Sequence, residues 1–171
     1  MKTTIIILLL VFITLPGYCE DYKMKIDEDV SVYFPEAPKG VRFDGDIRLN
    51  NKAGITVAFG TYKEGKLEGM AYDYYADGKI HIEALYKKGL RHGELKVYYE
   101  DGNIMQTVTY VNGVLDGLGN RYHRNGIQQF ELIYKHNEII SGFCIQGNKR
   151  TAIERSEIIN WNGQGRAPVC N

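Results

Sequence analysis

The sequence predicts a mainly β protein, a single antiparallel meander of stacked β-hairpins that ends in a short helix. The first observation is a repeat of 24 residues whose units begin at Gly45, Gly69, Gly93 and Gly117. A period of roughly 20–50 residues is typical of stacked supersecondary units. The second observation is the alternation of Ile80, Ile82, Ala84 and Tyr86 in the second half of a unit. A period of two with one apolar face indicates a half-buried strand.

Residues 1–19 have the features of a secretory signal peptide. Lys2 precedes an apolar run from Ile5 to Ile13, and a Pro-Gly pair follows it. This order predicts cleavage after Cys19 and export to the periplasm or the medium. The run is shorter than the roughly 20 residues of a membrane-spanning helix, so no transmembrane segment is expected after signal removal. The alternative is an outer-membrane lipoprotein anchored at Cys19, although Tyr18 stands where that motif normally has a small residue.

Residues 20–44 are expected to form a lead-in with a capping strand, and residues 45–142 the four repeats. In each later unit a turn signal separates two β-type runs: Asp77-Gly78, Asp101-Gly102 and Asn125-Gly126. These dipeptides predict two-residue type I′ turns, which need positive φ at both central positions. A second turn, such as Lys88-Gly89, joins each unit to the next. The fourth unit gains one residue, because Tyr134 to Gly142 takes eight steps where earlier units take seven.

Residues 143–171 are expected to form a helix and a disulfide-closed tail. The run from Thr151 to Glu154 resembles a capping box, and the helical spacing that follows predicts about eleven residues ending at Gly163. This helix is expected to cover the final sheet edge, with Trp161 in the core. Cys144 and Cys170 remain after signal removal, and an exported chain with two cysteines favours a disulfide between them. A reactive thiol would need a neighbouring base, and the sequence offers none.

Composition and motifs argue against several classes of function. Lys plus Arg and Asp plus Glu are balanced at 21 each, so electrostatic attraction to nucleic acid or anionic lipid is not indicated. The four histidines fall at different offsets within their units, and no metalloprotease, phosphate-loop or nucleophile-elbow motif is present. We therefore expect no enzyme activity, no cofactor and no metal site.

The candidate binding residues are two rows of aromatic side chains generated by the repeat. Tyr74, Tyr98 and Tyr122 form one row, and Tyr75, Tyr99 and His123 form a second row on the other face. Rigid aromatic rings are favoured at interfaces. The first row is the better candidate for exposure, and a purely structural role is an equal alternative. A further column, Tyr62, Tyr86, Tyr110 and Tyr134, continues the apolar face and is expected in the core.

The segments Tyr62–Gly69, Tyr86–Gly93 and Tyr110–Gly117, each followed by an aromatic pair and Asp-Gly or Asn-Gly, resemble the MORN repeat and more closely its bacterial variant. The resemblance covers about residues 41–142. It implies stacked β-hairpins and a binding or scaffolding role. Some bacterial members are labelled antitoxins, but the export signal and the tail with two cysteines depart from the family pattern.

The sequence leaves three functional hypotheses. The first is an exported, non-enzymatic module that binds a protein or a cell-envelope component. The alternative is an immunity or antitoxin-type protein that neutralises one cognate toxin. The third is an envelope hydrolase, which would require a concave site with converging polar groups.

Overall fold

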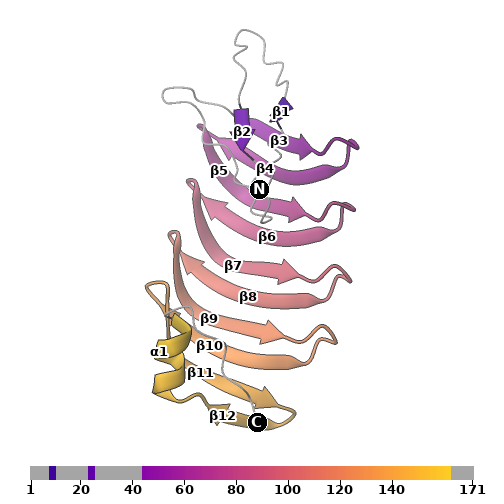
Figure 1. Cartoon of the computed structure of the whole chain (residues 1–171). Coiled ribbons are helices and arrows are strands. Elements are labelled where there is room, and N and C mark those ends of the chain that lie inside the picture. Colours follow the sequence, from indigo (N-terminus) through magenta and orange to yellow (C-terminus); the bar gives the residue numbers. More distant parts are fainter. Residues whose placement is uncertain (1–7, 11–22, 26–43, 163–171) are drawn as a thin grey trace, which may run out of the picture.

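The protein is a long single-layer β-sheet with one short helix packed on one face (Figure 1). The computed structural model describes residues 8–10, 23–25 and 44–162. Within them, ten strands follow one another across the main sheet in chain order, from β3 to β12, and every pair is antiparallel. The predicted fold class, an antiparallel meander with a short C-terminal helix, is confirmed.

The strands of the main sheet are six to nine residues long, apart from a four-residue last strand. Their bounds are β3 Gly45–Asn50, β4 Thr56–Lys63, β5 Lys66–Tyr74, β6 Ile80–Lys87, β7 Leu90–Tyr98, β8 Ile104–Val111, β9 Val114–Tyr122, β10 Gln128–Lys135, β11 Glu138–Gln146 and β12 Lys149–Ala152. The helix α1 spans Arg155–Asn162. A separate two-stranded sheet pairs β1, Leu8–Leu10, with β2, Lys23–Lys25.

The two faces of the sheet carry different side chains because successive residues of a strand point to opposite sides. We call the face that carries α1 the α1 face. Its central row consists of residues paired directly across neighbouring strands: Gly60, Ala71, Ala84, Leu95, Val108, Gly119, Leu132 and Gly142. The other face is called the outer face, and its central row is Arg48, Phe59, Tyr72, Glu83, Lys96, Thr107, Asn120, Glu131 and Phe143.

The turns differ from the prediction in an informative way. Asp77, Asp101 and Asn125 do not have positive φ, so the type I′ assignment at these positions is wrong. Each of these turns is instead a three-residue loop. In the first of them the Gly78 amide donates a hydrogen bond to the Tyr75 carbonyl, and Gly78 is the one residue of that loop with a positive φ. The carboxylate of Asp77 accepts the amide of Lys79 at 3.1 Å, and the same Asx bond recurs in the next two units. Asp and Asn are therefore suited to this position by their side-chain oxygen.

The type I′ turns lie in the other column, between the units. Glu64-Gly65, Lys88-Gly89 and Asn112-Gly113 each have positive φ at both residues. The fourth turn of this column, His136-Asn137, adopts the same conformation without glycine, and the Asn137 side chain accepts the Leu115 amide at 2.9 Å. The tight strand reversals therefore occur where the units join.

The last unit and the helix also depart from their predicted positions. Gly142 pairs with Leu132, so it occupies the register position of Ala71, Leu95 and Gly119; the fourth unit has lost a residue and not gained one. The helix begins later than predicted because residues 149–152 form β12. The side chain of Glu157 accepts the Glu154 amide at 3.3 Å, so the capping interaction lies at Glu154.

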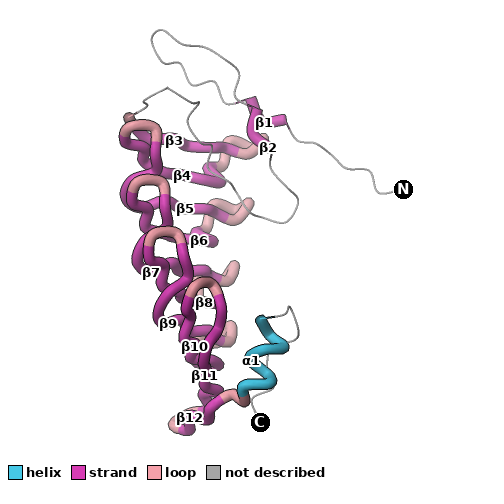
Figure 2. The backbone as a smooth tube through the Cα atoms, turned by 90° about the vertical axis from the view of Figure 1, so that its left-hand side faces the viewer, coloured by secondary structure: helices cyan, strands magenta, loops and turns pink. Residues whose placement is uncertain are grey.

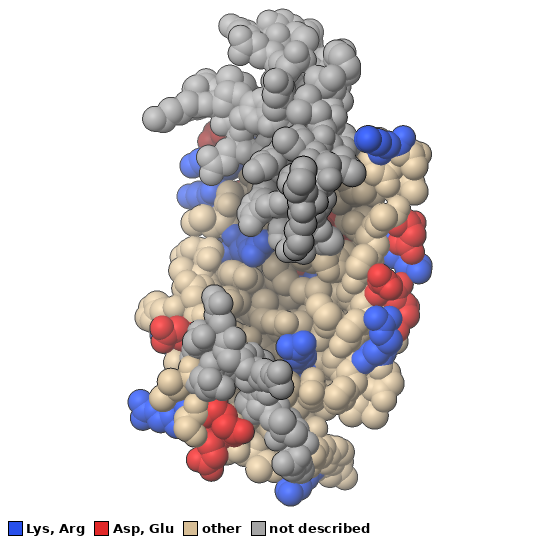
Figure 3. All heavy atoms as spheres, viewed as in Figure 1, with Lys and Arg blue, Asp and Glu red and all other residues tan. Residues whose placement is uncertain are grey.

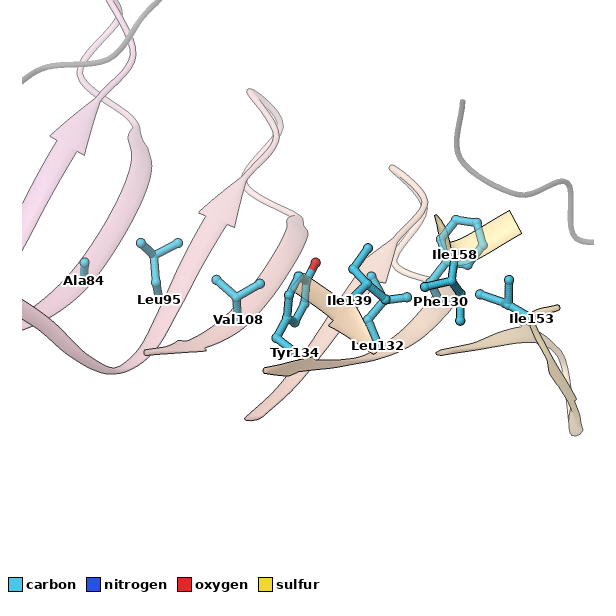
Figure 4. Close-up of a cluster of buried hydrophobic side chains, with 9 residues drawn as sticks. All are labelled: Ala84, Leu95, Val108, Phe130, Leu132, Tyr134, Ile139, Ile153 and Ile158. Atoms are coloured by element: carbon cyan, nitrogen blue, oxygen red, sulfur yellow. The ribbon is translucent and has the colours of Figure 1, made fainter. Parts of the chain in front are cut away.

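The helix covers a face of the sheet, and the prediction that it covers the final edge is wrong. Figure 2 shows α1 beside the sheet, near its C-terminal end, while β12 forms the edge. Ile153 and Ile158 are buried together with Phe130 and Leu132 of β10 (Figure 4). A second buried cluster lies on the first hairpins and includes Leu49, Ala58 and Tyr62. The core is therefore two apolar clusters on one side of a single sheet.

Several predictions fall on residues outside the described ranges. These include most of the signal peptide, the capping strand near Val30–Phe34, the helix end at Gly163 and Cys170. The side chain of Trp161 is likewise outside the described part. Among the described residues, no helix has both the length and the apolar character needed to cross a membrane.

Candidate functional site

The first predicted row lies at the ends of β5, β7 and β9 on the outer face. Tyr74, Tyr98 and Tyr122 are all half-buried, so none is fully exposed. The ring of Tyr74 stacks 6.2 Å from that of Tyr72. Burial, followed by a hydrogen bond to Glu83, raises the pKa of the Tyr98 hydroxyl above its usual value. These tyrosines form a partly accessible aromatic surface supported by neighbours on the same face.

The second predicted row lies where the strands enter the turns. The Tyr75 hydroxyl donates to the Tyr98 carbonyl at 2.6 Å, and the Tyr99 hydroxyl donates to the Tyr122 carbonyl at 2.8 Å. Each bond joins one unit to the next, which gives these two tyrosines a structural role. His123 occupies the next equivalent position and is exposed.

The column of four tyrosines on the α1 face is buried only at its ends. Tyr62 is 3% exposed and Tyr134 is 9% exposed, as predicted for core residues. Tyr86 and Tyr110, in the middle, are half-buried. The side chain of Arg91 lies between these two tyrosines and contacts both hydroxyls.

Arg91 interrupts an apolar column of the repeat. The equivalent residues, 24 positions apart, are Leu67, Leu115 and Ile139 at the start of β5, β9 and β11. Its side chain is fixed by two phenol oxygens: Nε donates to the Tyr86 hydroxyl at 3.2 Å, and Nη1 donates to the Tyr110 hydroxyl at 3.3 Å. The guanidinium carbon also lies 5.4 Å from the centroid of the Tyr110 ring.

The charge of Arg91 is maintained despite its surroundings. Burial lowers its pKa, but the hydrogen bonds and the electrostatic influence of the Tyr86 and Tyr110 hydroxyls outweigh burial and leave the pKa above the usual value. No ion pair to Arg91 within 4.0 Å is found in the described part of the chain. Arg91 is therefore a fixed cation whose Nη2 group forms no hydrogen bond with the described residues.

Asp73 is a second charged exception on the α1 face. It is half-buried on β5 and pairs across the sheet with Ala58 and Ile82. Desolvation raises its pKa from 3.8 to about 6, and the charge of Arg91 opposes that rise. Its Oδ1 atom is buried and forms no hydrogen bond with the residues that the structure describes. A buried carboxylate oxygen of this kind is costly when ionised.

Polar side chains continue along the same side of the α1 face. The positions equivalent to Asp73 are Leu49, Val97 and Arg121, so the column is apolar in two units and charged in two. Arg121 pairs across the sheet with Gln106 and makes no ion pair with the described residues. In Figure 3 this face is hollowed along its middle, and basic side chains lie within the hollow.

The arrangement offers hydrogen-bond donors from two guanidinium groups, phenol rings, and one carboxyl group that titrates near pH 6. These groups suit the recognition of a polar ligand. Among the described residues there is no cluster of three or more His, Cys, Asp or Glu side chains that could hold a metal ion. The Nδ1 atoms of His81 and His92 are buried and form no hydrogen bond within the described part of the chain, and burial lowers the pKa of His81.

Arg91, Asp73 and Arg121 were not predicted from the sequence, because the prediction rested on the residues that the units share. A signal was present: each charge stands at an inward position where other units carry an aliphatic residue. A comparison of the units for exceptions would have identified all three residues. The two tyrosine acceptors of Arg91 were not predictable, because the pairing of Tyr86 with Arg91 depends on a register shift between β6 and β7.

Comparison with known protein families matches the MORN repeat variant at residues 67–88 and again at residues 91–112. The two matches cover β5 to β8 and most of the turns between them. They start two residues before the units that begin at Gly69 and Gly93, and they have the same period of 24 residues. No curated protein matches the chain.

Proposed function

Because residues 67–88 and 91–112 are MORN repeats of the variant type, which suggest a repeat-based binding module, we propose that this protein is an exported, non-enzymatic module of this kind. Its aromatic outer face would contact a protein or a cell-envelope component.

One observation carries the proposal for the outer face. Phe59 and Tyr72 lie 6.2 Å apart between ring centroids, and Tyr72 stacks on Tyr74 at the same distance. Arg48 lies over the Phe59 ring at 4.6 Å. Tyr98 continues the row one unit further along the sheet. Such a set of partly exposed rings with a nearby cation supplies apolar contact area together with polar rim groups, as protein interfaces do.

The test is capture of a partner from envelope extract with the mature chain and two variants. In the first, Tyr74, Tyr98 and Tyr122 are changed to alanine. In the matched control, Leu90, Val111 and Ile127, which lie next to turns and are 49%, 46% and 55% exposed, are changed to alanine. Thermal unfolding of both variants shows whether they remain folded. Loss of the partner with the first variant alone supports the proposal, and equal capture by both rejects the aromatic row.

Export rests on the sequence of residues 1–19, and the disulfide rests on the two cysteines of the mature chain. Expression with the native N-terminus, followed by intact mass measurement, distinguishes a chain starting at Glu20 from one lipidated at Cys19. Alkylation with and without prior reduction then shows whether Cys144 and Cys170 are bridged. A full-length cytoplasmic product with three free thiols, those of Cys19, Cys144 and Cys170, would contradict both proposals. No structural observation favours the antitoxin alternative or a hydrolase, so each remains a hypothesis.

A further inference from the structure

We infer that the α1 face carries a carboxylate-binding site, centred on Arg91 and extended by Arg121, that takes an acidic polypeptide segment. This site lies on the opposite side of the sheet from the aromatic row proposed above. The two proposals therefore stand on different residues and fail independently.

The position of Arg91 in the repeat indicates that its charge serves something other than the fold. In the equivalent column the other units carry Leu67, Leu115 and Ile139, and Leu67 and Ile139 are buried. An aliphatic residue therefore fits this site in the fold, and stacking of the units does not need the charge. Replacing one hydrophobic residue of a column by arginine gives up apolar burial. That loss is accounted for if the guanidinium binds something.

The geometry of the Arg91 guanidinium suits the binding of a carboxylate. The Tyr86 and Tyr110 hydroxyls accept from Nε and Nη1 and hold the planar group in one orientation. Nη2 and the second proton of Nη1 form the remaining edge of the group, and this edge matches the two oxygens of a carboxylate. Arg91 is exposed on the sheet face, so a ligand can reach that edge.

The charge of Asp73 near Arg91 favours a carboxylate over a phosphate as the ligand. Asp73 is close enough for Arg91 to lower its pKa, so the two charges influence each other. With a pKa of about 6, Asp73 is largely ionised at neutral pH. A doubly charged phosphate at Arg91 would be repelled more strongly by this carboxylate than a singly charged group. The local charge balance therefore favours a carboxylate.

The length of the hollow favours a peptide. Arg91 lies near the start of β7 and Arg121 near the end of β9, so the two residues are separated by two strand spacings, about 10 Å, and also by several residues along the strands. An extended peptide advances about 3.3 Å per residue, so acidic side chains a few residues apart can reach both arginines. Half-buried Ile82 and Val97 lie in the cross-strand row between Asp73 and Arg121 and supply apolar contact next to Arg121.

The experiment measures binding of a fluorescein-labelled oligoglutamate peptide of about eight residues, long enough to span both arginines, to the full mature chain by anisotropy. Arg91→Leu restores the residue of the equivalent positions. We expect it to raise the Kd about tenfold or more, the usual size for a charge-assisted bidentate contact. Arg91→Lys keeps the charge but loses the planar fork, and we expect it to weaken binding as well.

The matched control is Arg124→Leu, which removes the same charge from a turn where Arg124 pairs with Asp101 at 3.4 Å. Its Kd is expected to stay within about twofold of the unaltered chain, because an exposed charge acts weakly at a distance. Urea unfolding is measured for all three variants. If Arg91→Leu fails to fold, Arg91→Lys decides the question.

Four results would overturn the inference. They are no binding of oligoglutamate by the unaltered chain, an unchanged Kd in Arg91→Leu, full binding by Arg91→Lys, and an equal loss in Arg124→Leu. A fifth is displacement of the peptide by polygalacturonate at lower carboxylate concentration than free oligoglutamate requires. That outcome would identify an acidic polysaccharide in place of the peptide.

Discussion

The half-buried carboxyl of Asp73 predicts that the stability of this protein falls as pH rises through the weakly acidic range. Desolvation raises its pKa from 3.8 to about 6 in the folded chain. One pKa unit corresponds to about 1.4 kcal/mol, so the ionised form destabilises the folded state by about 3 kcal/mol. The folded chain binds the proton more tightly than the unfolded chain. The penalty is therefore small below pH 3.8, grows between 3.8 and about 6, and is complete above that.

The variant Asp73→Asn isolates this effect, because it keeps the size of the side chain and removes the titration. Urea unfolding of both proteins at about pH 4 and about pH 7.5 gives the difference in free energy of unfolding at each pH. We expect the variant to gain about 2–3 kcal/mol relative to the unaltered protein on going from the lower to the higher pH. Other carboxyl groups titrate in both proteins and cancel in the comparison.

The physical account of Asp73 is refuted by either of two results. One is a stability difference between the two proteins that does not change with pH. The other is a relative gain of the unaltered protein at the higher pH, which would mean that Asp73 is stabilised as an anion. Arg91→Leu provides a second check, because the charge of Arg91 holds the Asp73 pKa down. Its removal should move the midpoint of the pH dependence upward.

Three further substitutions test the turns and the packing. Lys88→Asn should stabilise the chain by about 0.5 kcal/mol or more, since Lys88 has a φ of 52° and asparagine tolerates that conformation better, whereas Lys87→Asn should give no gain. Gly119→Ala should destabilise by about 1–3 kcal/mol because the new Cβ would lie 2.6 Å from Cε2 of Tyr134, and the loss should shrink in a Tyr134→Leu background. Tyr99→Phe should cost about 0.5–1.5 kcal/mol through loss of its bond to the next unit, and an unchanged urea midpoint would contradict that role.

The fold was predictable because every unit repeats the same turn residues and the same alternation of apolar and polar residues. Glycine at the turns and alternation along the strands both indicate an antiparallel meander, and agreement between such signals is what specifies a structure. The errors arose where two turn types share similar residues. Asp-Gly is compatible with a type I′ turn, but the Asx bond of Asp77 and the left-handed Gly78 produce a three-residue loop. Sequence preference identified the turn, and the hydrogen bonds decided its type.

The ends of the array were less predictable for a physical reason. A residue lost from the last unit places Gly142, and not Phe143, opposite Leu132, and only the pairing of the strands reveals it. The start of α1 depends on whether residues 149–152 join the sheet, where they pair with β11. Tertiary contacts decide whether residues 149–152 form a strand or part of the helix, and a local capping motif gives no information about those contacts.

Repetition also provides a way to separate function from structure in this chain. A residue that makes the same contact in successive units is explained by stacking, and this accounts for Tyr75 and Tyr99, whose hydroxyls each bind a backbone carbonyl of the next unit. A charge in an otherwise aliphatic column has no such explanation. If Arg91 serves a ligand, Arg91→Leu should lose oligoglutamate binding and keep or raise the free energy of unfolding, because stability is commonly given up at binding sites. The unfolding is measured at about pH 4, where the folded chain holds Asp73 protonated and the loss of the Arg91 charge has little effect on it. If Arg91 is structural through its two tyrosine bonds, the same variant should unfold more easily. One substitution measured by two assays therefore decides between the roles.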